Sequence, residues 1–324
     1  NKIEKEIKRL QTTNYKLRTK KEASSLIRLF DPKPEYFKQI RKLIDFNAIK
    51  EAKLKIAVDC LYGTSREYLD FLLNDAGVET TVLHNWLNPY FEGKRPEPAP
   101  ENIEELIDAV KKKRLDLGLA TDGDADRFGI IDSGGTYINP NQVITLLLYH
   151  LIQTRKIGKD MIAVRTQATT HMIDAVAAKY GIEVKETPVG FKYFAPYILS
   201  GKCIIAGEES GGLSIMGHLP EKDGVLACLL IAEMAAITKK PLSKTLKSLY
   251  ESAGSFYSDR IDLSLPEEKK QKLIRSLAKA TPKEFAGKKV LKSDKQDGCK
   301  LYLEDKSWVM FRPSGTEPII RCYF

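Results

Sequence analysis

The sequence predicts an α/β protein with two consecutive similar α/β domains, followed by a smaller α+β domain with an antiparallel sheet. Short apolar runs alternate with amphipathic helical patterns in residues 28–136, and a similar order restarts in residues 137–252. In residues 253–324 strands gather around a single helical segment, which is typical of an α+β domain. A chain of 324 residues is also longer than one typical core, so several domains are expected.

The first α/β domain should contain a helix, a βαβ unit and a further helix that leads into two strands. Apolar residues at helical spacing mark its helices, and short apolar runs mark its strands. The expected helices are residues 36–44, 68–73 and 103–110, and the expected strands are residues 54–58, 78–83, 115–119 and 128–131. Segment 88–100 is rich in proline and charge, so it should be a loop.

The second α/β domain should repeat this alternation, and the third should combine one helix with several strands. In the second, helices are expected at residues 143–152, 172–180 and 225–237, and strands at residues 161–164, 182–184 and 203–206. In the third, we expect strands at residues 261–265, around Leu301 and at residues 308–311, and a helix at residues 266–280. Residues 1–27 are too short for a domain and should form a basic amphipathic helix followed by an extended piece.

The composition indicates a soluble globular protein that does not enter membranes. The chain is 43% hydrophobic, has no apolar run long enough to span a bilayer and starts with charged residues. Its five cysteines are scattered without Cys-x-x-Cys spacing, which argues against a disulfide framework or a zinc site and favours a reducing cytosol. We therefore expect a cytoplasmic protein.

The net charge of +9 allows either an anionic small molecule or a nucleic acid as a partner. Much of the excess is local, at residues 2–21, 111–114 and 269–272. In these segments basic and apolar residues alternate at helical spacing, so we interpret them as solvated helix faces. Because no RNP-like aromatic and basic segment and no helix-turn-helix pattern stands out, we expect no binding to nucleic acid.

Three carboxylates alternate along one segment, at Asp122, Asp124 and Asp126, and Arg127 follows directly. The segment lies between two expected strands, and Gly123 permits a tight turn. Carboxylates at alternate positions of a loop can converge on a hard cation such as Mg²⁺, which prefers oxygen ligands. Arg127 would place a forked positive charge beside the metal, which suits a phosphate. The pattern therefore predicts a magnesium site.

Two other interpretations of this acidic loop are weaker. An acidic surface turn does not explain why strands flank the loop, and three packed carboxylates would repel one another without a cation. An EF-hand also opens with this spacing, but it requires glycine at its sixth position and glutamate at its twelfth. Those positions hold Arg127 and Ser133, so we reject an EF-hand.

A second candidate binding segment lies near the end of the chain, at Arg312-Pro-Ser-Gly-Thr-Glu-Pro318. Between two expected strands, an arginine, two hydroxyls and a glycine can form a phosphate-binding loop. The arginine offers paired donors, and the hydroxyls and exposed amides offer others. A simple Ser-Gly hairpin turn explains the segment equally well, although it would need neither Arg312 nor Arg321.

Three loops, one at the end of each expected domain, stand in order: Asp122–Arg127, Gly207–Gly212 and Arg312–Pro318. In this order and spacing they resemble the α-D-phosphohexomutase family, which includes phosphoglucomutases and phosphomannomutases. The resemblance covers nearly the whole chain from about Asp31. It includes four further segments: Asn88-Pro-Tyr-Phe91, Pro96-Glu-Pro98, Gly190-Phe-Lys192 and Glu221-Lys-Asp-Gly224.

The resemblance implies a role for each loop. The metal would be bound by Asp122, Asp124 and Asp126. Catalytic candidates are Arg127, which would steady the reacting phosphoryl group, and Lys222. The sugar would be held by Glu208 and Ser210, with Lys192 and His218 as further contacts, although a surface-loop histidine explains His218 equally well. The phosphate that does not react would be bound by Arg312, Ser314, Gly315, Thr316 and Arg321.

One departure from the family concerns the nucleophile. Members carry a phosphorylated serine in a first domain, within a Thr-Ala-Ser-His-Asn-Pro-like loop. This chain has four histidines, and none of them follows a serine. We therefore expect residues 1–27 to be the tail of a missing first domain, and the 324 residues alone to be inactive.

The activity that the resemblance implies is that of a Mg²⁺-dependent isomerase. It would interconvert hexose 1-phosphate and hexose 6-phosphate through a phosphoserine and a bisphosphate intermediate, with glucose 1,6-bisphosphate as activator. Glu208-Glu209-Ser210 without a following histidine favours glucose over mannose, by resemblance alone. The rival hypothesis is a non-catalytic protein that binds a phosphosugar and a metal.

Overall fold

The computed structural model describes residues 2–12, 24, 27–314 and 318–324. The chain divides into two compact units, Asn1–Lys38 and Gln39–Phe324. The smaller unit contains α1 (Lys2–Thr12), which confirms the helix expected there. Most of the extended piece expected after α1 lies outside the described residues. The helix α3 (Lys33–Leu43) runs from the smaller unit into the larger one.

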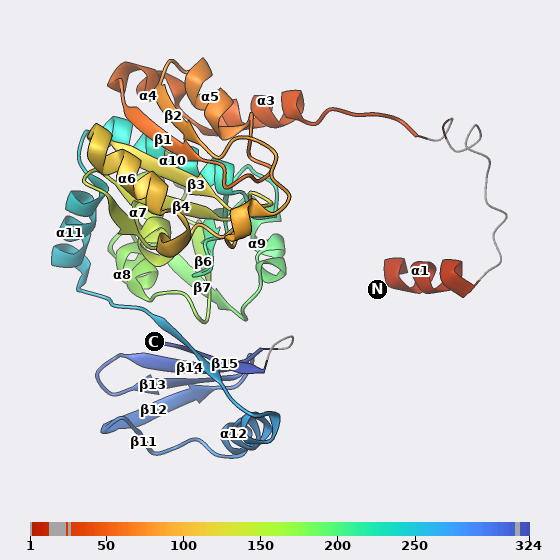
Figure 1. Cartoon of the computed structure of the whole chain (residues 1–324). Coiled ribbons are helices and arrows are strands. Elements are labelled where there is room, and N and C mark those ends of the chain that lie inside the picture. Colours follow the sequence, from red (N-terminus) through yellow and green to blue (C-terminus); the bar gives the residue numbers. More distant parts are fainter. Residues whose placement is uncertain (1, 13–23, 25–26, 315–317) are drawn as a thin grey trace. The chain divides into compact units, whose positions relative to one another are not determined.

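A five-stranded sheet forms the core of the first α/β domain (Figure 1). Its order is β2-β1-β3-β4-β5, with β1 parallel to β2 and β3, and with β4 and β5 antiparallel to their neighbours. The strands are β1 (Lys55–Asp59), β2 (Glu79–Leu83), β3 (Leu117–Thr121), β4 (Phe128–Asp132) and β5 (Thr136–Ile138). The helices of this part are α4 (Phe46–Ala52), α5 (Leu69–Asp75) and α6 (Glu104–Lys113), with short 3₁₀ turns η1 (Phe91–Gly93) and η2 (Pro100–Asn102).

The second α/β domain is built on a four-stranded sheet of order β7-β6-β8-β9. Its strands are β6 (Ile162–Thr166), β7 (Glu183–Thr187), β8 (Cys203–Gly207) and β9 (Leu213–Ile215). Its helices are α7 (Pro140–Thr154), α8 (Met172–Lys179), η3 (Phe191–Tyr193), α9 (Ala195–Leu199), α10 (Gly224–Thr238) and α11 (Leu242–Ala253). β6 is parallel to β7 and β8, whereas β9 is antiparallel to β8.

The two sheets share one plan. In each, the last parallel strand, β3 or β8, is followed by an antiparallel strand, β4 or β9. The connection between the two strands of each pair carries one candidate loop, residues 122–127 in the first sheet and residues 208–212 in the second. Both candidate loops therefore leave the carboxyl end of a parallel strand, where open α/β sheets commonly bind ligands.

Helix α10 packs against both α/β domains. Thirteen of its fifteen residues are buried. It contacts β3, β4 and α4 of the first domain and β9 and α7 of the second. A helix that is apolar all round belongs in a core, since every face needs apolar surroundings. A second contact also connects the two domains. Both carboxylate oxygens of Asp132, at the end of β4, accept hydrogen bonds at 2.9 Å from the first two backbone N–H groups of α11.

The C-terminal domain is a six-stranded antiparallel sheet with one helix, α12 (Glu267–Lys279). The order across the sheet is β10-β15-β14-β13-β12-β11. The strands are β10 (Arg260–Ser264), β11 (Glu284–Phe285), β12 (Lys288–Asp294), β13 (Cys299–Leu303), β14 (Trp308–Pro313) and β15 (Ile319–Tyr323). With two similar α/β domains before it, this sheet confirms the predicted fold class.

Several elements were not expected from the sequence. The helix expected at residues 36–44 is confirmed as α3, but the separate helix α4 that follows it was not expected. The Asp45 side chain accepts from the N–H of Ala48 and so caps the start of α4. The strands β5 and β9 have only three residues each, too few to show a period. The five-residue helix α9 and the twelve-residue helix α11 were also missed.

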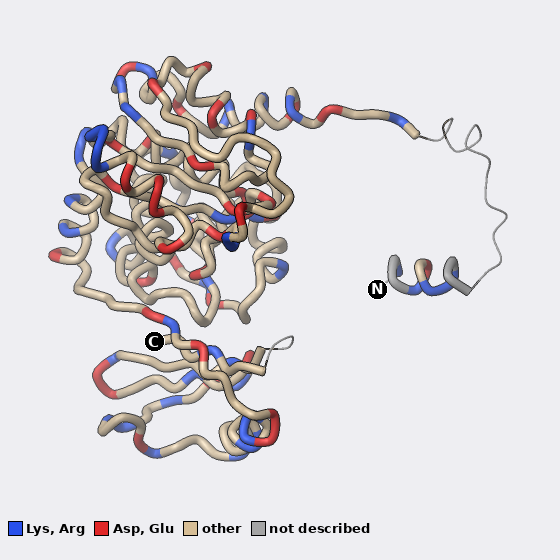
Figure 2. Tube along the Cα trace, viewed as in Figure 1, with Lys and Arg blue, Asp and Glu red and all other residues tan. Residues whose placement is uncertain are grey.

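Charged residues of both signs are interspersed along the larger unit (Figure 2). The basic segment 111–114 forms the last turn of α6, whose first turn is acidic, an order that suits the helix dipole. The interpretation of segment 269–272 as a solvated face is wrong for Lys270. That side chain is buried, and its Nζ donates to the carbonyl of Ser314 at 3.0 Å.

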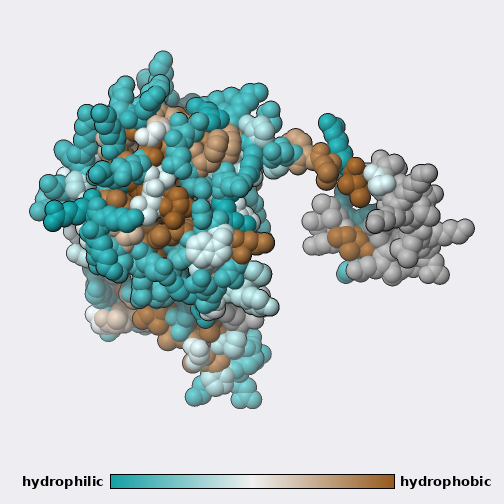
Figure 3. All heavy atoms as spheres, turned by 45° about the horizontal axis from the view of Figure 1, so that its top comes forward, coloured by the Kyte–Doolittle hydropathy of each residue, from teal (hydrophilic) through white to brown (hydrophobic). Residues whose placement is uncertain are grey.

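The face shown in Figure 3 is mainly hydrophilic, with small separate apolar patches. Exposed apolar side chains of the segment after β2 include Trp86, Leu87 and Tyr90. Among the described residues, every helix is too short or too polar to cross a membrane.

Candidate functional site

The acidic loop is held in place by backbone contacts from three other segments. Gly123 N–H donates to the carbonyl of Pro96, and the Gly123 carbonyl accepts from the N–H of Thr64, both at 3.0 Å. A Cβ on Gly63 would come within 2.7 Å of the Asp122 carbonyl, and a Cβ on Gly224 would overlap the Arg127 carbonyl. Only glycine permits so close an approach at these two positions.

The three carboxylates of this loop converge in the structure. One oxygen from each of Asp122, Asp124 and Asp126 lies within 4.8 Å of the others. Asp122 is buried, Asp126 is half-buried and Asp124 is exposed, so the group opens to solvent on the side of Asp124. Burial raises the pKa of Asp122 to about 7, opposed by the backbone N–H of Arg127 and reinforced by the charges of Asp126 and Asp124.

Two cations lie beside these carboxylates. Lys222 Nζ is 2.6 Å from Asp126 Oδ2. The Arg127 side chain is 2.6 Å from Glu97 and 3.7 Å from Asp126 Oδ1, and its backbone N–H donates to Asp122. Asp126 Oδ1 and Arg127 Nε are nevertheless buried without a hydrogen-bond partner among the described residues. Oxygen donors of this kind fit a hard divalent cation, and the Arg127 nitrogen fits an anion next to it.

The second loop meets the first through Lys222. The stem of Lys222 lies directly against Gly212, at the end of the second loop. Ser210 Oγ donates to Glu208 Oε1 at 3.0 Å, while Glu208 Oε2 is buried and lacks a hydrogen-bond partner in the described part of the chain. Burial raises the pKa of Glu208, and the charge of Glu209 raises it further, whereas Lys222 and Arg127 act against the shift. A buried carboxylate oxygen such as Oε2, with no hydrogen bond from the described residues, suits a ligand hydroxyl.

Glu209 is a charged residue of this loop that sequence reasoning did not assign. Its carboxylate accepts hydrogen bonds from Thr166 at 3.1 Å and Thr169 at 3.4 Å. Burial raises the pKa of Glu209, and the positive charges of Arg260 and Arg312 oppose this. The second loop therefore lies within electrostatic reach of the arginines on the C-terminal sheet.

His218 is not a surface histidine. Its side chain is 2% exposed, and Nε2 lies 2.9 Å from Asp223 Oδ2. The other carboxylate oxygen of Asp223 accepts the N–H of Leu226 and so caps α10. His218 thus contacts Asp223, the N-cap residue of α10. Lys192 is exposed and lies over the ring of Tyr193, with Nζ 5.1 Å from the ring centroid.

The third loop follows β14, and part of it lies outside the described residues. Gly315 and Thr316, both predicted to bind phosphate, belong to that part. Ser314 is buried, and its N–H donates to the carbonyl of Ile319 at 3.0 Å. Arg312 and Arg321 occupy directly opposite positions on the antiparallel strands β14 and β15. Like charges opposite one another destabilise a sheet, so this pair favours an anion between or beside them.

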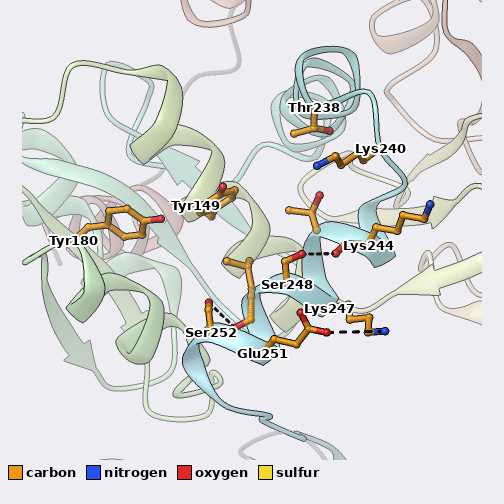
Figure 4. Close-up of a pocket in the computed structure, with 11 residues that line it drawn as sticks. Tyr149, Tyr180, Thr238, Lys240, Lys244, Lys247, Ser248, Glu251 and Ser252 are labelled. Carbon is orange, nitrogen blue, oxygen red and sulfur yellow. Dashed lines mark hydrogen bonds and ion pairs between the residues drawn. The ribbon is translucent and has the colours of Figure 1, made fainter.

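A separate hollow of about 720 Å³ lies between α7, α8 and α11 (Figure 4). Its wall includes Tyr149, Tyr180 and Lys240. Two of its hydroxyls, those of Ser248 and Ser252, donate to carbonyls of α11. These hydroxyls are already used within the helix, so they do not form donors prepared for a ligand, and none of the three candidate loops lines the hollow.

Sequence reasoning also missed the residues that support the acidic loop. Gly63, Thr64 and Pro96 contact it from segments about 30 to 60 residues away in sequence. Glu97, which pairs with Arg127, lies in the proline-rich segment 88–100. The only signal available was the resemblance itself, which included Pro96-Glu-Pro98 without assigning a role to it.

The chain matches two models of one protein family. The model described as phosphoglucomutase/phosphomannomutase, alpha/beta/alpha domain II, matches residues 34–135. The model of alpha/beta/alpha domain III of the same family matches residues 139–253.

Individual relatives and solved structures agree. A phosphoglucomutase/phosphomannomutase of Thermococcus kodakarensis is 30% identical over 288 residues, which cover 89% of this chain and 60% of the relative. A phosphoglucomutase of Komagataeibacter xylinus is 28% identical over 316 residues, covering 89% of this chain and 56% of the relative. A candidate phosphomannomutase of Thermus thermophilus has a crystal structure with a TM-score of 0.76 and 30% identity, covering 91% of this chain and 62% of that chain.

The chain spans about 60% of the length of the curated relatives that it matches. Two successive domain models of one family match in the expected order, and a structure of the family superposes on most of the chain. The chain therefore belongs to the α-D-phosphohexomutase family, the family of the phosphoglucomutases and phosphomannomutases.

Proposed function

We propose that this chain forms the metal- and substrate-binding part of a phosphohexomutase that interconverts hexose 1-phosphate and hexose 6-phosphate. The observation that carries the proposal is the meeting of the acidic loop with the second loop. Lys222 contacts Asp126 of the first and Gly212 of the second, and buried polar atoms of Arg127 and Glu208 face this junction without hydrogen-bond partners among the described residues. Such a junction suits a ligand with a phosphate and hydroxyls.

The residues of the acidic loop would hold the metal. Asp122, Asp124 and Asp126 supply the oxygen ligands that Mg²⁺ prefers. When bound, Mg²⁺ neutralises negative charge on a phosphoryl group. Arg127 would donate to that group, and its guanidinium is paired with Glu97 at 2.6 Å. Lys222 is the second cation within reach and the candidate for holding a proton near the reacting oxygen.

The other two loops would hold the rest of the substrate. Glu208 would accept hydrogen bonds from sugar hydroxyls, and Ser210 would exchange hydrogen bonds with them. Lys192 would be a further contact. His218 would then act through Asp223, because it lies buried against that residue. Arg312, Arg321 and the loop after Ser314 would bind the phosphate that does not react. The surplus of positive charge, +9 overall, favours a dianionic ligand.

Glucose is the sugar that we propose, with glucose 1,6-bisphosphate as the intermediate. Relatives of similar identity carry names for glucose, mannose and glucosamine phosphates. Glucose and mannose differ at one hydroxyl, so a direct comparison of glucose 1-phosphate with mannose 1-phosphate in the same titration tests this choice. Tighter binding of the mannose compound would contradict it.

Arg312→Ala is expected to weaken binding of glucose 1-phosphate and glucose 6-phosphate by on the order of tenfold or more. The loss follows because hydrogen bonds to a charged partner contribute about 1.5–3 kcal/mol each. Isothermal titration calorimetry in the presence of Mg²⁺ measures the effect. Arg275→Ala, on the exposed face of α12 in the same domain, is the matched control and should bind as the wild type does. Unchanged affinity in Arg312→Ala would remove this arginine from the site.

The 324-residue chain on its own is expected to bind Mg²⁺ and phosphosugar without turnover. Transfer within one sugar by the family's route needs a phosphoserine, and no serine of this sequence stands in the matching loop. Without that relay the rate should fall by many orders of magnitude. A coupled assay from glucose 1-phosphate to glucose 6-phosphate, with added glucose 1,6-bisphosphate, measures it. Robust turnover would show that another residue carries the phosphoryl group.

The rival function is a non-catalytic protein that binds a phosphosugar and a metal. The two hypotheses share every binding residue, so binding data alone do not separate them. A serine-bearing domain of the family, added as a separate polypeptide, does separate them. Turnover in the mixture supports the mutase, and continued inactivity with intact binding supports the rival.

A further inference from the structure

In the part of the chain that the structure describes, Asp297 contacts Arg312 through a single nitrogen, Nε. Arg312 Nε donates to Asp297 Oδ2 at 2.9 Å. A guanidinium has two edges that can each bind an oxyanion, one with Nε and one Nη, and one with both Nη groups. A contact through Nε fixes the plane of the guanidinium and does not use the edge formed by the two Nη groups. That edge has the geometry for a bidentate phosphate.

The same carboxylate oxygen reaches the second α/β domain. Asp297 Oδ2 also accepts the backbone N–H of Val189 at 2.9 Å. Val189 lies between β7 and η3, in the loop that leads to Lys192. One oxygen thus connects the arginine of the third loop with a segment predicted to contact the sugar. Both side chains of the pair are largely covered, with 24% of Arg312 and 22% of Asp297 exposed.

The backbone around Asp297 fixes its position next to β14. Asp297 lies in the turn between β12 and β13, where the N–H of Gln296 donates to Asp294. Gly298 has φ +87°, and a Cβ there would overlap the carbonyl of Phe311, the residue before Arg312. A residue other than glycine would therefore push the turn away from β14. A closely packed turn therefore positions the carboxylate of Asp297 beside Arg312.

Around the pair of Arg312 and Asp297, a second arginine adds to the positive charge. Arg312 lies opposite Arg321, and the next position across the sheet is Asp262, which is paired with Arg260 at 3.1 Å. Asp297 is the carboxylate in direct contact with Arg312. It offsets part of the repulsion between the two opposite arginines without occupying both edges of either guanidinium.

We propose that Asp297 is a positioning residue for phosphate binding. It orients Arg312 through Nε so that both Nη groups face the phosphate, and it fixes this arginine relative to the loop of Val189 and Lys192. This inference rests on the proposed function, because it assumes that Arg312 binds the phosphate of the substrate.

Three variants test the proposal with glucose 1-phosphate as the probe, in the full chain with Mg²⁺. Asp297→Ala is expected to weaken binding on the order of tenfold, since the arginine loses its orienting partner. Asp297→Asn should recover part of this loss, because its side-chain oxygen can still accept from Nε. In the Arg312→Ala background, Asp297→Ala should add little, because its effect runs through Arg312. Asp305→Ala, in the turn between β13 and β14, is the control and should bind normally.

The outcomes separate this proposal from the function on which it rests. Unchanged affinity in Arg312→Ala overturns the phosphate site itself. A clear loss in Arg312→Ala with none in Asp297→Ala overturns only the positioning role. A loss in Asp297→Ala that adds in full to that of Arg312→Ala shows a general structural effect and also overturns it. Tighter binding in Asp297→Ala would show that the carboxylate competes with phosphate for the arginine, which contradicts the proposal.

Discussion

Asp124→Asn is expected to weaken Mg²⁺ binding by about 10–100-fold, the size of one lost interaction with a charged ligand. Asp124 is the exposed member of the three converging carboxylates, so its replacement leaves the buried part of the loop intact. Asparagine keeps the shape and one oxygen but removes a full charge from the metal. The titration is best done at pH 8, where Asp122, whose pKa burial raises to about 7, is ionised.

The same substitution should affect stability in the opposite direction. Without metal, the charges of Asp124 and Asp126 act against ionisation of Asp122, so removing one charge relieves repulsion. We expect the metal-free variant to melt at or above the temperature of the wild type, and to gain less stability from added Mg²⁺. Asp160→Asn, at a largely exposed carboxylate, is the control. An unchanged Mg²⁺ affinity in Asp124→Asn would refute the metal site.

Glu186→Gln is expected to lower the free energy of unfolding by about 3 kcal/mol at pH 7. The substitution removes the negative partner of a largely buried ion pair and leaves its cations in place. Glu186 Oε2 accepts from Lys300 Nζ at 2.9 Å and from Arg165 at 2.6 Å. The side chain of Lys300 is fully buried and that of Arg165 is 4% exposed. Glutamine keeps the volume, but both cations lose a charged partner.

The penalty of this substitution should depend on pH. Burial would raise the pKa of Glu186, but His171, Lys300 and Arg165 lower it well below its usual range. The contribution of Glu186 to stability is therefore complete above the ordinary glutamate pKa of 4.5, and it is lost progressively as the pH falls below that value. Burial lowers the pKa of Lys300 to about 8, so above pH 8 the folded protein loses this proton while the unfolded chain keeps it up to 10.5. The penalty should be largest between about pH 5 and 8 and smaller above.

Trp308 offers a local measurement of this effect, since Lys300 Nζ lies 4.3 Å from its ring centroid. The chain has two tryptophans, so a Trp86→Phe background leaves Trp308 as the fluorescent reporter of urea unfolding. Glu183→Gln is the matched control: it lies on the same strand, and its carboxylate is exposed and paired with Lys185. Equal stability of Glu186→Gln and the wild type at pH 7 would contradict the assigned role of the pair.

The sequence predicts the domain architecture because hydrophobic periodicity is a local property. The helix at residues 143–152 and the helix at residues 225–237 are found within a few residues of their expected positions, as α7 and α10. The acidic loop is also local, since three carboxylates at alternate positions converge whenever the chain turns tightly. These features need no knowledge of distant contacts.

The parts that could not be predicted depend on pairs of distant residues. From the sequence, Lys270 is predicted to lie on the solvated face of a basic helix. In the structure it is buried, because α12 packs beside the segment of Ser314. From the sequence, Asp297 is predicted to be a turn residue. Its contact with Arg312 arises when β14 packs beside that turn, and its contact with Val189 arises only when two domains meet. No periodicity in a single sequence encodes such a pairing, so the supporting residues of the site emerge only from the structure.

Helix α10 has a consequence for how the protein is made. It covers β3 and β4 of the first sheet, although it is synthesised long after them, at residues 224–238. On a ribosome that adds about 5–20 residues per second, the first sheet waits on the order of ten seconds with part of its apolar face uncovered. The nascent chain should therefore bind chaperones during this interval. A ribosome-bound chain that stops at residue 136 should remain sensitive to protease, and one that extends well past residue 238 should become resistant.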